Sequence, residues 1–191
     1  PAIVRQVRFS QTTFNPNANP ETTSVDGDAY RGSVDEVWAT IRTGAGSTAR
    51  PSDTSIQMGN IERAATNWRY ITRLFTLFDS SSLPDNSNIT SATYSLYAVG
   101  KNNDLGTAQS VGVITTTPAS NTDIVAADYS QTGTTRQATD VTIASITLSA
   151  YNDFTLNATG LLNISKTGIT KFGTRISGDI DDAEPAAGGT N

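Results

Sequence analysis

Two apolar segments separated by a polar connection dominate the pattern of hydrophobic and polar positions along this chain. The first segment, LFTLF at 74–78, would place apolar side chains on both faces of an extended backbone, which is typical of a strand inside a sheet. The second segment, at 92–99, alternates with a period of two and is rich in β-branched and aromatic residues. We therefore expect both segments to be strands of the core.

The connection at 80–88 is predicted to be a loop, because Pro84 cannot donate to a strand ladder, and Leu83 is expected to pin the loop to the body. Short helical turns are predicted at 121–129, where Asn121 or Thr122 would cap, and at 159–166. Further short strands are predicted at 34–42 (with Trp38 pointing inward), 54–61, 110–117, 139–148, 153–156 and 169–176.

About eight to ten short strands with only scraps of helix predict an all-β fold, an antiparallel β-sandwich that is jelly-roll-like and carries one or two short helical turns. Residues 1–20 are expected to form an N-terminal arm, or a first strand followed by a linker, because 15–21 contains two prolines. Residues 21–180 would form the sandwich, and residues 181–191 a flexible tail of acidic and small residues.

Charge and composition exclude several classes of function. The net charge is −5 and the basic residues form no stripe, so we expect no nucleic-acid partner. Apolar runs fall short of the roughly 18–20 residues of a membrane span, so we expect no membrane partner. The chain contains no histidine and no cysteine, which removes ordinary zinc sites and the Ser-His and Cys-His nucleophile pairs.

Acidic residues near the C-terminus are the densest set of hard oxygen ligands. A loop of this kind could hold a structural calcium ion with help from backbone carbonyls, although it lacks the EF-hand spacing. The alternative is that the loop is simply solvated. The candidate calcium ligands are Asp179, Asp181, Asp182 and Glu184.

Paired carboxylates for glycoside hydrolysis are not indicated. Asp35 and Glu36 are neighbours, and adjacent residues of a strand point to opposite faces of the sheet. A retaining pair needs carboxyl groups about 5 Å apart and an inverting pair roughly 6.5–9.5 Å apart. We therefore expect a protein without enzymatic activity and without catalytic residues.

Aromatic residues offer a candidate ligand platform. Trp38 and Tyr94 are assigned to the core, whereas Trp68 and Tyr97 are predicted to face outward and could stack on sugar rings. Packing in an interface between subunits explains an exposed aromatic side chain equally well.

The N-terminal arm carries Arg5 and Arg8, which could dock onto an acidic patch of a neighbouring subunit. The alternative is a solvated strand face. On the first reading the partners are other copies of this chain or other surface proteins.

Three stretches carry a resemblance to a known family: WATIRTGAG at 38–46, RLFTLFDSSSLPDNSNITSATYSLY at 73–97 and YNDFTLNATGLLNISKTGITKFGTRISGD at 151–179. Together they resemble the non-catalytic jelly-roll domains of the disaggregatase-related repeat type, which are similar to carbohydrate-binding modules. The chain also looks like uncharacterised virion proteins of tailed phages. The family pattern continues into a final strand ending like Pro-Lys-Leu-Val, which this sequence lacks. Either the product is cut or truncated, or a neighbour supplies that strand by β-augmentation.

The resemblance implies the fold. It says less about the role, because this fold hosts many roles. We expect a structural surface module, specifically a phage virion component such as a capsid decoration or fibre protein, which acts through protein–protein assembly and host-surface attachment. The alternative is a glycan-binding module of a secreted polysaccharide-degrading or adhesive protein. The expected location is a virion surface or the extracellular space, with cell-surface glycans as possible ligands.

Overall fold

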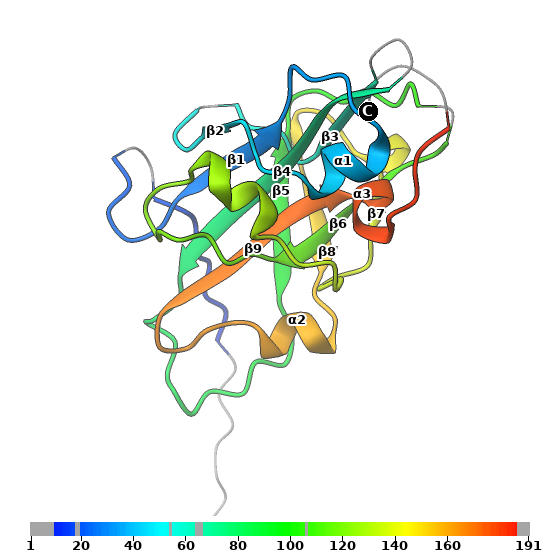
Figure 1. The fold of residues 1–191 in the computed structure, drawn as a ribbon. Coiled ribbons are helices and arrows are strands. Elements are labelled where there is room, and N and C mark those ends of the chain that lie inside the picture. The colour runs from blue at the N-terminus through cyan, green and yellow to red at the C-terminus, as the bar shows by residue number, and fades with distance from the viewer. Residues whose placement is uncertain (1–9, 18–19, 54, 64–66, 106, 187–191) are drawn as a thin grey trace, which may run out of the picture.

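The computed structural model confirms the expected all-β, sandwich-like fold (Figure 1). It describes residues 10–17, 20–53, 55–63, 67–105 and 107–186. Within these residues the strands form two antiparallel sheets, and the helices are short. The described part contains no helix that is long and apolar enough to cross a membrane.

The larger sheet has seven strands in the order β2-β1-β4-β9-β6-β7, and β3 pairs with β4 off this path. Its strands are β1 (Asp26–Arg31), β2 (Thr48–Arg50), β3 (Asn60–Arg63), β4 (Trp68–Asp79), β6 (Ser110–Thr115), β7 (Val141–Thr142) and β9 (Ile169–Ile176).

Strand β4 is the centre of this sheet. It pairs with β1 along one edge, and along the other edge with β9 over 74–79 and with β3 over 68–72. Leu74, Phe75 and Leu77 are completely buried, as expected for a strand with apolar side chains on both faces. The prediction of an interior strand at 74–78 is therefore confirmed.

The smaller sheet consists of β5 (Thr93–Ala98) and β8 (Ala150–Thr155), paired antiparallel in register. Alternate residues point inward, so Tyr94 and Phe154 are buried while their neighbours along each strand are exposed. The period-2 prediction for 92–99 is confirmed, and so is the burial of Tyr94.

The two sheets pack face to face through aromatic side chains. The Tyr94 ring lies 6.0 Å from the rings of Phe78 and Phe154 and 6.4 Å from that of Phe172, each in an edge-to-face arrangement. The Tyr94 hydroxyl also bonds the Thr76 hydroxyl at 2.8 Å. Burial raises the pKa of this phenol, so it stays protonated and available as a hydrogen-bond donor.

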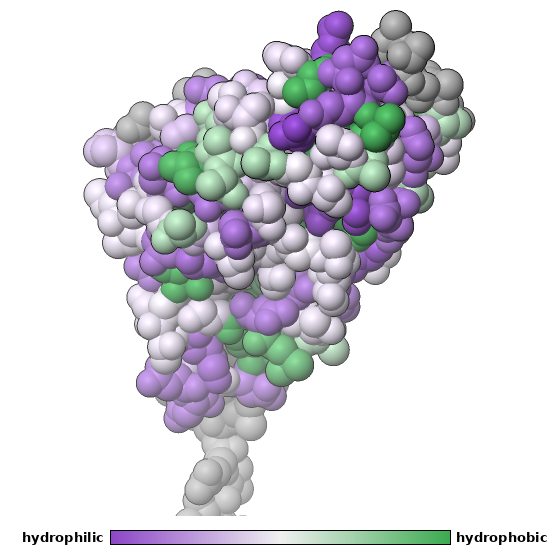
Figure 2. All heavy atoms as spheres, viewed as in Figure 1, coloured by the Kyte–Doolittle hydropathy of each residue, from purple (hydrophilic) through white to green (hydrophobic). Residues whose placement is uncertain are grey.

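The opposite face of the large sheet is covered by helices: α1 (Trp38–Thr43), the 3-10 turn η1 (Ala126–Ser130) and α3 (Ser177–Asp181) (Figure 1). Seen from this side, hydrophobic residues form small separate groups among hydrophilic ones (Figure 2).

The predicted strand at 34–42 is wrong. Residues 38–43 form α1, which buries Trp38 and Ile41 three positions apart, while Val37, the residue before the helix, is exposed. An apolar spacing of three suits one face of a helix, whereas a strand would have placed Trp38 and Ile41 on opposite faces. The inward position of Trp38 is nevertheless confirmed.

Three further element predictions need correction. Strand β3 begins at residue 60, so most of 54–61 is not strand, and 139–148 shortens to β7 followed by the 3-10 turn η2 (Ile143–Ser145). The turn predicted at 121–129 is η1, which begins after Val125. Neither Asn121 nor Thr122 caps it. Instead, the buried Asp128 carboxylate accepts a hydrogen bond from the Val125 N–H. The helix predicted at 159–166 is α2 (Ala158–Leu162), with Asn157 as its cap.

Helix α3 is held to the large sheet by a buried charge cluster. Asp179 is 1% exposed and accepts hydrogen bonds of 2.7–2.8 Å from the guanidinium groups of Arg73 and Arg175. The remaining guanidinium nitrogens bond backbone carbonyls, among them those of Tyr129 and Gly133. Burial opposes the charged carboxylate, but the two arginines outweigh it and lower the pKa of Asp179.

Candidate functional site

The four predicted calcium ligands are paired with arginine and tryptophan side chains, and Arg42 lies 3.7 Å from Asp179 and 3.3 Å from Asp182. Asp179 binds Arg73 and Arg175, and Asp181 forms two hydrogen bonds with Arg136 at 2.6 and 2.8 Å. The other two acids accept hydrogen bonds from the indoles of the two tryptophans. These bonds are Trp38 to Asp182 at 3.1 Å and Trp68 to Glu184 at 2.7 Å.

This arrangement gives the calcium prediction no support. Across the described residues, no group of three or more acidic side chains is placed to hold a metal ion. Arginines and indole N–H groups already satisfy the carboxylates that a cation would need. These contacts also join the acidic stretch to the body as far as Glu184, within the segment from residue 181 that was predicted to be a flexible tail.

Trp68 does not face outward, contrary to prediction. Its side chain is completely buried, and its ring lies 5.1 Å from that of Trp38 on α1 in an edge-to-face contact. The helix that the sequence pattern missed is what covers it. No face of Trp68 is therefore open to a ligand.

Tyr97 does face outward, as predicted, and is 52% exposed. It pairs across the small sheet with Tyr151, which is 71% exposed, and the two ring centroids are 5.3 Å apart. Beside them the Ser95 hydroxyl donates to Asp153 at 2.6 Å. We call the exposed side of this sheet the outer face; it consists of Thr93, Ser95, Tyr97, Tyr151, Asp153 and Thr155.

Arg5 and Arg8 lie outside the described residues. Residues 10–17 of the predicted arm contain no strand. Asn17 joins this segment to the body, because its side-chain oxygen accepts hydrogen bonds from the N–H groups of Thr23 and Ser24 at 2.7 and 2.9 Å.

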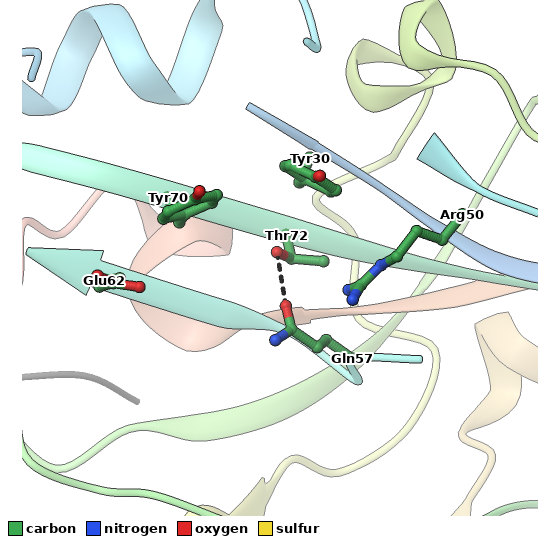
Figure 3. Close-up of a pocket in the computed structure, with 6 residues that line it drawn as sticks. All are labelled: Tyr30, Arg50, Gln57, Glu62, Tyr70 and Thr72. Atoms are coloured by element: carbon green, nitrogen blue, oxygen red, sulfur yellow. Dashed lines mark hydrogen bonds between the residues drawn. The ribbon is translucent and has the colours of Figure 1, made fainter. Parts of the chain in front are cut away.

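A pocket of about 320 Å³ lies over β1, β2, β3 and β4, at the end of β4 where Trp68 begins the strand (Figure 3). Register places its residues on one face, because Tyr30 pairs with Thr72 and Glu62 pairs with Tyr70. This is the same sheet face that the small sheet covers farther along, where Thr76 meets Tyr94. We call it the tyrosine pocket; it is lined by Tyr30, Arg50, Gln57, Glu62, Tyr70 and Thr72.

Two aromatic rings form one wall of the tyrosine pocket. The Tyr30 and Tyr70 centroids are 5.8 Å apart with an interplanar angle of 49°. Tyr70 packs on Gly32, where a Cβ atom would lie 2.1 Å from its ring, so this contact requires glycine. The next residue, Ser33, adopts a left-handed conformation with φ of 59° and bonds the Tyr70 hydroxyl at 2.7 Å.

Arg50 enters the pocket from β2 and is held from behind. The completely buried Asp28 carboxylate accepts hydrogen bonds from Nε of Arg50 at 2.9 Å and from Nη2 at 2.6 Å. These hydrogen bonds raise the pKa of Arg50, and its guanidinium also lies 5.5 Å from the centroid of the Tyr30 ring. The third nitrogen, Nη1, has no hydrogen-bond partner among the described residues, so it can donate to a ligand.

The remaining polar groups lie between and opposite these residues. In Figure 3, Thr72 and Gln57 occupy the middle, with Arg50 at one end and Glu62 at the other. The Thr72 hydroxyl donates to the Gln57 carbonyl oxygen at 2.9 Å, which leaves the Gln57 amide nitrogen without a partner in the described structure. The pocket therefore combines two aromatic rings with separate donor and acceptor groups.

Sequence reasoning did not find this pocket. Its six residues come from four strands and the segment that precedes β3, and they span positions 30–72. No spacing motif connects such residues, since strand register brings them together. The available signal was weak: Tyr30 and Tyr70 each stand next to an arginine, and neither lies in a segment predicted above to be a strand.

Comparison of the chain with family models, with curated proteins and with solved structures finds no match. The tyrosine pocket and the outer face are therefore the two features of the molecule that bear on its function.

Proposed function

We propose that this protein is a non-enzymatic surface module that binds carbohydrate through the tyrosine pocket. The single observation that supports the proposal is the convergence of two tyrosine rings with donors and acceptors in one open hollow. Sugar rings present apolar C–H faces that stack on aromatic rings, and hydroxyl groups that both donate and accept hydrogen bonds. Ligand sites in general combine apolar walls with a few placed polar groups.

Binding fits the pocket better than catalysis does. Glu62 is the one carboxylate among the six lining residues. The nearby Asp28 is completely buried, and both of its oxygens accept hydrogen bonds from Arg50. Hydrolysis of a glycosidic bond by the usual mechanisms needs two available carboxyl groups at a defined separation.

Removing either aromatic ring should weaken carbohydrate binding. We expect Tyr30→Ala and Tyr70→Ala each to lower affinity about tenfold, since an aromatic contact contributes up to about 1.5 kcal/mol beyond area burial. Screening the full chain on a glycan array, followed by affinity gel electrophoresis with the best ligands, measures this effect.

Two controls accompany these variants. Tyr30→Phe keeps the ring and should retain most of the affinity, while Tyr151→Ala on the outer face should leave it unchanged. Absence of binding to every glycan would contradict the proposal, as would equal losses in the Tyr151 and pocket variants.

A second candidate function is assembly on the outside of a particle, for which we propose a phage virion component such as a capsid decoration or fibre protein. The observation that favours it is the outer face, where two large aromatic side chains stand in solvent, with Val99 exposed at 71% close to them along the chain. Exposed aromatic patches on a polar surface are typical of protein interfaces. Carbohydrate binding would then serve attachment to a host surface.

The assembly proposal makes a prediction about mass in solution. We expect size-exclusion chromatography with light scattering to show an oligomer, and the double variant Tyr97→Ser/Tyr151→Ser to shift it toward the monomer, because the variant removes two aromatic side chains from the interface. Tyr70→Ala should leave the mass unchanged. A wild-type chain that stays monomeric at high concentration would count against this role and in favour of a glycan-binding module within a secreted protein.

A further inference from the structure

We infer that the tyrosine pocket selects carbohydrate without acidic groups, meaning neutral or amino-bearing sugars. This inference rests on the proposed function and adds the substrate class. The reasons are the way in which Arg50 is neutralised and the position of Glu62.

Arg50 does not make the pocket attractive to anions. Asp28 takes two of its three guanidinium nitrogens at 2.6 and 2.9 Å, and a carboxylate oxygen of Asp53 lies 4.0 Å from Nε. A ligand carboxylate would therefore meet a guanidinium whose charge is already balanced, with only Nη1 free in the described structure. Both N–H groups of Nη1 can donate to a neutral hydroxyl or ring oxygen of a sugar.

Glu62 makes the opposite end of the pocket unfavourable for anions. Its side chain is 29% exposed, and its partner Arg69 lies 3.4 Å away with 53% exposure, so solvent weakens the pairing. The charged side chains described around the pocket are three carboxylates and two arginines, which leaves one net negative charge. An acidic sugar would add a like charge there, whereas a hydroxyl or ammonium group can donate to Glu62.

The test compares matched neutral and acidic polymers with the full chain in affinity gel electrophoresis. Each of three acidic polymers, polygalacturonate, glucuronan and mannuronan, is paired with the neutral polymer obtained by reducing its carboxyl groups, so that the two members of a pair share their linkages and differ at C6. We expect at least one neutral polymer to bind about tenfold more tightly than its acidic counterpart, because like charges at close range disfavour binding. Glu62→Gln should reduce the ratio of neutral-polymer affinity to acidic-polymer affinity several-fold.

A control variant separates the pocket from the overall charge. Asp85→Asn also removes one negative charge, but from the exposed loop that follows the far end of β4, and it should leave the ratio unchanged. Acidic polymers that bind as tightly as neutral ones, or equal effects of the two variants, would overturn the inference alone. Absence of binding to these polymers and to every glycan of the array would overturn the proposed function and this inference with it.

Discussion

Replacing Asp179 with asparagine is expected to lower the free energy of unfolding by about 3–5 kcal/mol, the cost of removing one partner from a buried ion cluster. Asp179 is 1% exposed and lies between the guanidinium groups of Arg73 and Arg175, which are themselves 4% and 3% exposed. Without the carboxylate, two buried positive charges face each other and cannot be neutralised, because arginine keeps its proton. Urea denaturation followed by tryptophan fluorescence measures the change.

Asp181→Asn is the matched control in the same helix. Asp181 also pairs with an arginine, Arg136, but its side chain is 48% exposed and that of Arg136 is 32% exposed. A pair in water contributes at most about 1 kcal/mol. Similar losses in the two variants would show that the Asp179 cluster does not hold α3 to the sheet in the way that its burial indicates.

The same carboxylate makes part of the stability depend on pH. The pKa of Asp179 is lowered in the folded protein, so its contribution is complete above its unfolded pKa of about 4 and is lost as pH falls through the lower folded value. The difference in stability between the wild-type chain and Asp179→Asn should therefore shrink below about pH 4. A difference that stays constant to the acid limit of folding would contradict this assignment.

Replacing Gly173 with alanine should destabilise the protein by about 3 kcal/mol, at the upper end of the usual cost of overpacking. Gly173 lies in β9 between Phe75 of β4 and Ile114 of β6. An added Cβ would stand 2.0 Å from the Leu74 carbonyl oxygen, which is backbone and cannot rotate away. The central strands would have to separate at this point, and thermal or urea unfolding would detect the loss.

Gly100→Ala provides the control for intrinsic effects of the glycine-to-alanine change. Gly100 follows β5, and a Cβ there meets no atom within 4 Å, so its substitution should change stability by less than about 1 kcal/mol in either direction. If Gly173→Ala changed stability equally little, the Leu74 carbonyl oxygen would have to lie farther from Gly173 than it does in this structure.

The pattern of apolar residues predicted the strands that build the core, because a buried strand face requires apolar residues at the positions that point inward. The segment 74–78 lies within β4, 110–117 contains β6, and 169–176 is β9. The same method failed at α1, where six residues bury only Trp38 and Ile41. So short an element leaves no pattern long enough to separate a period of two from one of 3.6.

The candidate site was harder to predict than the fold. Alternation along β5 correctly placed Tyr97 in solvent. It could not place Trp68, whose exposure depends on whether a helix from another part of the chain covers that end of β4. The acids near the C-terminus lie close together in the sequence, but their partners lie far away in it: Arg73 and Asp179 are 106 positions apart.

The sequence by itself determined the all-β class and the inward faces of the main strands, since both follow from the alternation of neighbouring residues. Tertiary structure alone decided which charges pair, which aromatic side chains are covered and which polar groups meet in the tyrosine pocket. The physical reason is that strand register and the packing of helices on a sheet are cooperative outcomes of the whole core. The residues next to an acidic side chain in the sequence therefore do not determine whether it binds calcium, faces solvent or pairs with two arginines.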